Sequence, residues 1–247
     1  MSVSIRRSLR SVLARAYRMA LGPANTSIAD EIARHNLDRW TMFVRTADFV
    51  NFERVEGDVL EFGVFGGVSL ALLACAHRCD PKGMTRRIVG YDSFRGLPDS
   101  AESHSRWKEG DCGRMHGWHP TLKLGDPVTA GVTLDLFRQC GLDAPELEVG
   151  LFQETIPTNV PAKYRAAAVV HIDCDVYESA KAVLDGIEPI LQEGTVLLFD
   201  EWFSYKGNPH KGEARAFFEF LETHPEWGAQ HYQTYGPYSD SYILYRK

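Results

Sequence analysis

The sequence predicts an α/β fold of the Rossmann-like kind, with a mostly parallel sheet and helices on both of its faces. Three observations predict it. Residues 166–172 and 195–199 are continuously apolar, as strands buried on both faces are. Residues 59–69 read as a strand, a glycine-rich turn and the start of a helix. Residues 230–235 and 241–245 flank a Gly-Pro turn, which predicts an antiparallel hairpin at the C-terminal end.

The elements alternate along the chain. A helix with an apolar stripe is expected at 28–53, and the strand that ends near residue 62 leads into a helix at 70–79. Further strands are expected at 87–92, 146–152, 166–172 and 195–199, with helices at 133–140, 177–192 and 213–223. Residues 99–129 form a long polar insert, which we expect to act as a lid because it follows a strand end.

Length and composition bound the class of protein. A chain of 247 residues with 44% hydrophobic residues can bury one large core. Its net charge of -6 gives no electrostatic footprint for nucleic acid. The five cysteines form no C-x-x-C pair, which argues against a zinc site and a disulfide scaffold and favours the cytoplasm. No run approaches the ~18 apolar residues of a membrane span, and no signal peptide is visible.

The N-terminal region differs from the rest. Residues 4–21 carry five arginines in an amphipathic pattern, which suits docking on the protein's own fold, on a partner subunit or on an anionic membrane. We therefore divide the chain into a helical extension, residues 1–54, which forms a lid or an oligomer contact, and a main domain, residues 55–247.

The glycine-rich turn has the pattern E-x-G-x-x-G-G. It lacks the G-x-G-x-x-G spacing that holds a dinucleotide pyrophosphate, which argues against a nicotinamide dehydrogenase. A carboxylate at Glu61 repels phosphate but can anchor the amino group of a zwitterionic ligand, directly or through water. Glycines permit a close approach of the backbone to that ligand. The candidate binding residues of the turn are Glu61, Gly63, Phe65, Gly66, Gly67 and Ser69.

Asp92 ends the next strand, roughly 20 to 30 residues downstream of the turn, which is the place of a ribose-binding carboxylate. A ribose without a phosphate site suggests S-adenosylmethionine. The alternative is a helix-capping aspartate. Phe152 and Gln153 arrive at the same edge, where an aromatic ring and an amide suit an adenine base. We add Ser93 and Phe94, which follow Asp92, to the candidate cofactor-binding residues.

Acidic residues follow the two apolar strands. Alternation along the first strand aims His171, Asp173 and Asp175 at one side, and Asp200 and Glu201 follow the second strand. Acids at the ends of buried strands need a partner, and a hard divalent cation is one. We expect Asp173, Asp200 and Glu201 to hold Mg²⁺ or another divalent cation. The alternative is that these acids are helix caps and solvated loop residues.

Four motifs together resemble the TylF/MycF family of macrocin-type O-methyltransferases. They are EFGVFGGVS at 61–69, YDSFRGLP at 91–98, HIDCDVYESA at 171–180 and DEW at 200–202. The resemblance covers about residues 55–202 and implies a class I methyltransferase sheet of seven strands, with metal-dependent methylation of sugar hydroxyls on antibiotics and related glycosides. The chain departs from the family pattern at four positions: Gly66, Val68, Cys174 and Glu201. Glu201 adds a methylene to a ligand, which would alter the metal geometry and favour manganese or calcium.

The expected function is methyl transfer from S-adenosylmethionine to a hydroxyl of a glycoside, in natural-product or glycan tailoring. The enzyme must orient the hydroxyl and remove its proton, and Asp173 or His210 is the candidate base. The aromatic side chains of the 99–129 insert suit stacking on a sugar ring. The resemblance also suggests a homo-oligomer. Two alternatives stay open: a catechol-type O-methyltransferase, and a non-catalytic or hydroxylase-type relative of the same fold.

Overall fold

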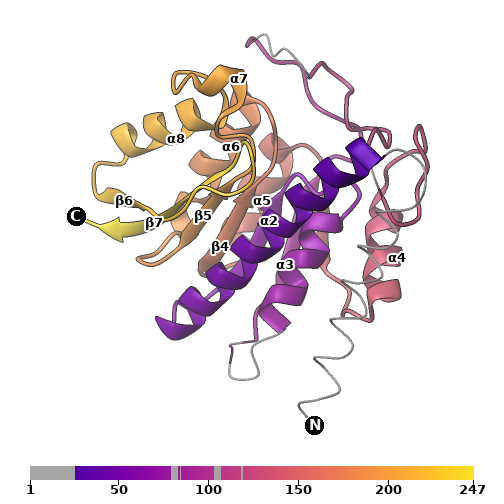
Figure 1. Ribbon diagram of the computed structural model, residues 1–247. Coiled ribbons are helices and arrows are strands. Elements are labelled where there is room, and N and C mark those ends of the chain that lie inside the picture. Colours follow the sequence, from indigo (N-terminus) through magenta and orange to yellow (C-terminus); the bar gives the residue numbers. More distant parts are fainter. Residues whose placement is uncertain (1–25, 79–82, 84, 103–106, 118) are drawn as a thin grey trace.

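The computed structural model describes residues 26–78, 83, 85–102, 107–117 and 119–247 (Figure 1). The basic segment 4–21 lies outside these residues. The strands are β1 (Asp58–Phe62), β2 (Ile88–Asp92), β3 (Glu146–Val149), β4 (Ala167–Ile172), β5 (Val196–Phe199), β6 (Trp227–His231) and β7 (Asp240–Arg246). They form a seven-stranded sheet in the order β3-β2-β1-β4-β5-β7-β6. The first five strands are parallel, and β7 is antiparallel to β5 and β6, which confirms the predicted fold class.

Helices cover both faces of the sheet (Figure 1). They are α2 (Thr26–Phe52), α3 (Val68–Arg78), α4 (Ala130–Cys140), α5 (Phe152–Lys163), α6 (Tyr177–Ile187), η1 (Glu188–Ile190), α7 (Ser204–Gly207) and α8 (Gly212–Thr223). One core lies between the sheet and α2 and α3, and includes Phe43, Val59 and Val169. The other lies under α5, α6 and α8, and includes Val170 and Phe217. Neighbouring residues of β4 thus enter opposite cores, as the alternation of a strand requires.

The strand order reverses between β1 and β4. The chain runs outward from β1 through β2 to β3, and then returns to place β4 on the other side of β1. The carboxyl ends of β1 and β4 therefore flank a topological switch point, where open α/β sheets bind ligands. The register pairs Glu61 with His171 at this point.

Several predicted elements have different bounds in the structure. The first strand of the C-terminal hairpin, expected at 230–235, is β6 at Trp227–His231. The strand expected at 146–152 ends at Val149, because α5 begins at Phe152. Pro157 lies inside α5, and because proline is unfavourable within a helix, the sequence did not predict a helix here. The helix expected at 177–192 ends at Ile187 and continues as a 3₁₀ turn, since Pro189 cannot donate the next helical hydrogen bond.

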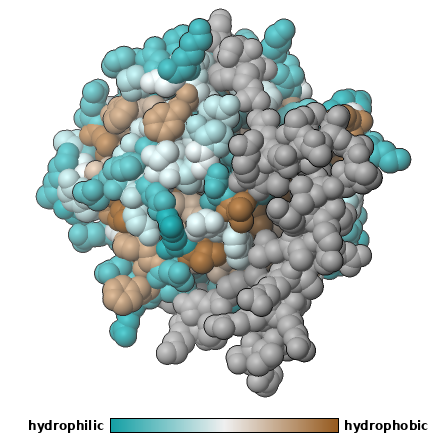
Figure 2. Space-filling model, viewed as in Figure 1, coloured by the Kyte–Doolittle hydropathy of each residue, from teal (hydrophilic) through white to brown (hydrophobic). Residues whose placement is uncertain are grey.

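Apolar side chains on the face shown in Figure 2 occur in small groups among hydrophilic ones. Within the residues that the structure describes, no helix has the length and apolar character needed to cross a membrane.

Candidate functional site

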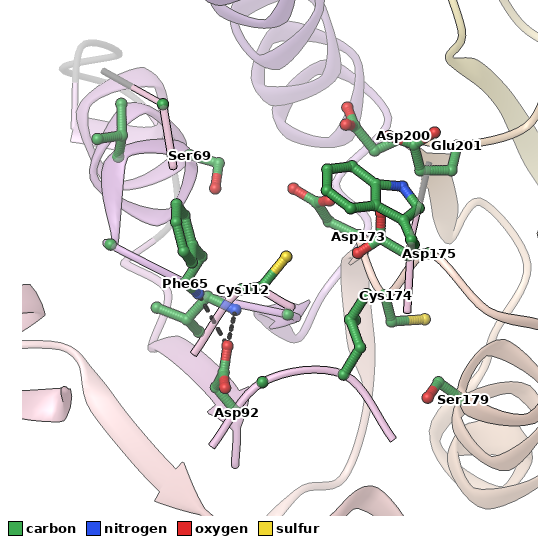
Figure 3. A pocket seen from close by; sticks show the side chains of 18 of the residues that line it. Phe65, Ser69, Asp92, Cys112, Asp173, Cys174, Asp175, Ser179, Asp200 and Glu201 are labelled. Carbon is green, nitrogen blue, oxygen red and sulfur yellow. Dashed lines mark hydrogen bonds between the residues drawn. The ribbon is translucent and has the colours of Figure 1, made fainter. Parts of the chain in front are cut away.

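A cavity of about 710 Å³ lies at the carboxyl ends of the parallel strands (Figure 3). The glycine turn, the ends of β2, β4 and β5, helix α2 and the polar insert all contribute to its wall. Its volume falls within the range of small-molecule sites. Figure 3 shows Asp92 on one side of this cavity, with Asp173 and Asp200 across from it.

Asp92 holds the glycine turn in place. Its Oδ2 accepts hydrogen bonds of 2.8 Å from the backbone N–H groups of Val64 and Phe65. Its Oδ1 accepts a 2.6 Å hydrogen bond from the N–H of Phe94. Phe65 has φ 48°, a left-handed conformation that costs energy for a side chain with a Cβ. The two hydrogen bonds from Val64 and Phe65 to this carboxylate offset that cost, so Asp92 shapes the turn from within the cavity wall.

Gly66 lies against the insert that covers the turn. A Cβ at position 66 would meet His119 Cδ2 at 2.7 Å, and His119 Nε2 lies 3.0 Å from the Gly66 carbonyl. Further along the insert, the His116 and Trp107 rings stack with centroids 5.4 Å apart, and His116 lies 4.9 Å from the Phe65 ring. The insert therefore forms part of the cavity wall, at the position expected of a lid.

The guanidinium of Arg39, from α2, lies between the two acids that follow β4 and β5. Its Nε donates to Asp200 Oδ1 at 2.9 Å, and its Nη2 donates to Asp173 Oδ2 at 3.0 Å and also to Asp200 Oδ2. His35, one turn earlier on α2, places Nε2 3.7 Å from Asp200 Oδ2. The sequence did not point to Arg39 or His35 as site residues. An apolar stripe shows which face of a helix is buried, but it does not show which residues the polar side chains contact.

The two acids of this pair differ in pKa. Burial raises the pKa of Asp173 to about 7, and the Asp200 charge adds to this while Arg39 opposes it. Burial also favours a higher pKa for Asp200, but the charge of Arg39 and the contact with His35 outweigh it and hold the pKa of Asp200 well below its usual range. Asp175, with φ 63°, also lines the cavity, and burial together with the Glu201 charge raises its pKa well above its usual range.

His171 and Glu61 form a fully buried pair behind these acids. His171 Nδ1 lies 2.8 Å from Glu61 Oε1. His171 Nε2 is buried, has no hydrogen-bond partner among the described residues and lies 4.0 Å from Asp200 Oδ1. Burial lowers the pKa of His171 and raises that of Glu61 to about 8, against the opposing effects of Ser69 and Arg39. One donor atom each of His171, Asp173 and Asp200 lie within 4.8 Å of one another.

Glu213, in the first turn of α8, joins the two acidic turns. It is 1% exposed, and its Oε1 accepts a hydrogen bond of 3.3 Å from the N–H of Cys174, between Asp173 and Asp175. Its Oε2 accepts one of 3.0 Å from the N–H of Glu201. Sequence reasoning missed this residue as well, since a glutamate near a helix start is an ordinary helix residue.

Most of the predicted site residues line the cavity. They are Gly63, Phe65, Gly66, Ser69, Asp92, Ser93, Phe152, Gln153, Asp173, Asp200 and Glu201. Glu61 is buried behind the wall, and Gly67 and Phe94 do not line the cavity either. His210 is exposed on the loop before α8, away from the lining. The roles of all these residues in binding and catalysis stay predictions.

Comparison with known proteins agrees with the resemblance seen in the motifs. The family model described as Macrocin-O-methyltransferase (TylF) matches residues 31–219. An 8-demethyl-8-(2,3-dimethoxy-alpha-L-rhamnosyl)-tetracenomycin-C 4'-O-methyltransferase from Streptomyces olivaceus is 30% identical over 152 residues, which cover 60% of this chain. The match spans about half of that relative, 54% of its length.

Two solved structures share the fold over nearly the full chain. The O-methyltransferase NovP superposes with a TM-score of 0.68 at 20% identity, covering 98% of each chain. The calicheamicin methyltransferase CalS11 superposes with a TM-score of 0.62 at 25% identity, covering 94% of this chain and 91% of its own. With a family match that extends from α2 through the cavity to α8, the chain belongs to the macrocin-O-methyltransferase (TylF) family.

Proposed function

We propose that the protein transfers a methyl group from S-adenosylmethionine to a hydroxyl of a glycoside, with the help of a divalent cation, in natural-product tailoring. The observation that carries this proposal is the meeting of two features in one cavity. The glycine turn held by Asp92 lies on one side, and the convergent carboxylates of Asp173 and Asp200 lie on the other. Family membership supports the reaction type.

The cofactor side fits S-adenosylmethionine. The glycine turn lines the cavity and packs closely on the turn after β4, since a Cβ at Gly63 would lie 1.7 Å from the Asp173 carbonyl oxygen. Asp92 would meet the ribose hydroxyls, and Phe152 and Gln153 the adenine. When bound, the sulfonium supplies an electrophilic methyl group, so the protein's task is to orient the acceptor oxygen in line with it and remove its proton.

The acidic side fits a cation. Asp173 and Asp200 converge on a point where the structure already places the positive charge of Arg39. Carboxylate oxygens suit magnesium and manganese, and Glu201 at the cavity wall is the third ligand of the proposed set. A divalent cation there would lower the pKa of an acceptor hydroxyl. Asp173 lines the cavity beside that position and is the proposed base; His210 remains the second candidate.

The acceptor side fits a sugar ring. Trp107, His116 and Tyr238 line the cavity, and aromatic faces pack well on sugar rings. The relative from Streptomyces olivaceus is named for methylating a rhamnosyl tetracenomycin, and CalS11 is described as a TDP-rhamnose 3'-O-methyltransferase. These names support a 6-deoxysugar as the acceptor class.

The surroundings of the site fit the remaining proposals. Residues of α2, among them His35 and Arg39, line the cavity, which supports the proposal that the extension 1–54 acts as a lid on the main domain 55–247. We propose that the protein is cytoplasmic, because Cys112, Cys140 and Cys174 are free thiols, and we propose a homo-oligomer on the family's example.

Calorimetric titration of S-adenosylmethionine and S-adenosylhomocysteine tests the cofactor. We expect micromolar binding by the wild-type protein and at least tenfold weaker binding by Asp92→Ala. Asp135→Asn, on the exposed surface of α4, is the matched control and should bind as the wild type does. Absence of binding by the wild-type protein, with or without a divalent cation, would overturn the methyltransferase proposal.

A further inference from the structure

We propose that His171 is a ligand of the cation held by Asp173 and Asp200, and that Glu61 positions its imidazole. The inference rests on the cation site of the proposed function and deepens it. The ligands of the cation would then include one imidazole nitrogen as well as carboxylate oxygens. The buried histidine, which has no role in a site built from oxygen ligands alone, would bind the cation directly.

The imidazole faces the acids. His171 packs against Phe43 of α2, and Asp173, just beyond the end of β4, accepts a hydrogen bond from Arg39 of the same helix, so both side chains lie on the α2 side of the sheet. His171 is 0% exposed, and its Nε2 has no hydrogen-bond partner within the described part of the chain. A buried ring nitrogen without a partner is costly, and a metal ion is one of the partners that removes this cost.

The distances suit one ion. Two ligands bound to one ion at about 2.1 Å each lie at most about 4.2 Å apart. His171 Nε2 is 4.0 Å from Asp200 Oδ1, and the three donor atoms of His171, Asp173 and Asp200 fall within 4.8 Å of one another. The widest of these spacings exceeds that limit by up to about 0.6 Å, so the donor atoms would have to move closer together by that amount to bind one ion.

Glu61 completes the arrangement from behind. Its Oε1 lies 2.8 Å from His171 Nδ1, and the two residues are register partners on adjacent strands. When Glu61 is ionised, its carboxylate accepts the Nδ1–H and leaves the Nε2 lone pair free for a metal, and this pairing is the usual support of a metal-binding histidine. The ring of Phe43, from α2, packs edge-on against the imidazole with centroids 5.2 Å apart. The imidazole is thus oriented by the sheet and by the helix.

Arg39 is the competitor for this site. Its guanidinium bridges Asp173 and Asp200, and its positive charge repels a second cation at the same oxygens. Removing the charge of Arg39 should therefore strengthen ion binding.

The donor set also predicts which ion binds. Magnesium and calcium prefer oxygen ligands, whereas imidazole suits first-row transition metals. We expect the wild-type protein to bind Mn²⁺ at least tenfold more tightly than Mg²⁺, with His171 responsible for part of the difference.

Electron paramagnetic resonance of the full-length protein with Mn²⁺ tests the inference. The expected result is a bound ion whose electron spin-echo modulation shows coupling to one ¹⁴N nucleus. His171→Gln, which keeps a donor toward Glu61, should lose that coupling and bind Mn²⁺ about tenfold or more weakly. Arg39→Met should bind it more tightly and retain the coupling.

The outcomes separate this inference from the proposed function. Bound Mn²⁺ without nitrogen coupling in the wild-type protein would overturn the role of His171 and leave the oxygen site standing. Absence of bound Mn²⁺ in both the wild type and Arg39→Met would overturn the cation site itself. The coupling is read on the wild-type protein, so a variant that fails to fold does not remove the test.

Discussion

Glu213 Oε2 accepts a hydrogen bond of 3.0 Å from the backbone N–H of Glu201, across the gap between α8 and the turn after β5. The other oxygen of the same carboxylate binds the N–H of Cys174 in the turn after β4. One buried side chain thus sets the spacing of the two turns that carry Asp173, Asp175, Asp200 and Glu201. The geometry of the acidic side of the cavity depends on a residue that does not line it.

The first prediction concerns this residue. Glu213→Ala leaves two backbone N–H groups unpaired, at a cost of about 1–3 kcal/mol for each that stays buried. We expect the free energy of unfolding, measured by urea denaturation, to fall by ~2 kcal/mol or more. Glu213→Gln retains one acceptor oxygen and should lose less. Equal stability of Glu213→Ala and the wild type would show that the two hydrogen bonds of Glu213 contribute nothing to the free energy of unfolding.

The second prediction concerns Gly66. Gly66→Ala places a Cβ 2.7 Å from His119 Cδ2, so either the glycine turn or the insert must shift. We expect S-adenosylmethionine binding, measured by calorimetry, to weaken about tenfold, a cost of ~1.4 kcal/mol. Gly131→Ala, at the exposed start of α4 where a Cβ meets nothing closer than 3.6 Å, is the matched control and should bind normally.

The double variant Gly66→Ala, His119→Ala sharpens that test. Removing the imidazole makes room for the new Cβ, so part of the lost affinity should return. If the double variant binds S-adenosylmethionine no better than Gly66→Ala does, the contact between residue 66 and His119 is not the reason for a glycine at this position.

The third prediction concerns pH and His77, on α3, far from the acids in sequence. Burial, with the charge of Arg86, lowers the pKa of His77 to about 4 from its usual 6.5, and neither ring nitrogen has a hydrogen-bond partner among the described residues. The unfolded chain therefore takes up a proton below pH 6.5 that the folded protein takes up only near pH 4. Stability is lost as the pH falls from 6.5 to about 4, by up to ~3 kcal/mol from this group.

His77→Leu removes this proton uptake. Urea denaturation at pH 7 and at pH 5 should show a smaller loss of stability on acidification in the variant than in the wild type. An identical loss in both proteins would mean that His77 titrates normally in the folded state.

The fold was predictable because its signals are local. The buried strands β4 and β5 are apolar along their whole length, and the glycine turn marks the end of β1. Helix α5 escaped prediction because Pro157 disguises a helix whose start at Phe152 follows directly on β3. The residues of the cavity wall were largely predictable too, since strand ends in a parallel sheet must converge on one edge.

The contacts within the site were not predictable in the same way. Arg39 reaches Asp173 and Asp200 across 134 and 161 positions of sequence, and no pattern in a helix announces such a contact. Glu61 illustrates the same limit. Its position before the glycines suggested contact with a ligand, but pairing with His171 depends on the register of β1 against β4, which the sequence does not reveal.

In the proposed reaction, one cavity brings S-adenosylmethionine, a divalent cation and a sugar hydroxyl together. The most direct measurement is methyl transfer from labelled S-adenosylmethionine to rhamnosyl glycosides, followed by mass spectrometry of the product, with Mn²⁺ or Mg²⁺ and with a chelator. We expect a methylated sugar whose formation stops on chelation and in Asp200→Asn, while S-adenosylmethionine still binds. Methylation that continues unchanged with the chelator, or that occurs on catechols but on no glycoside, would contradict it.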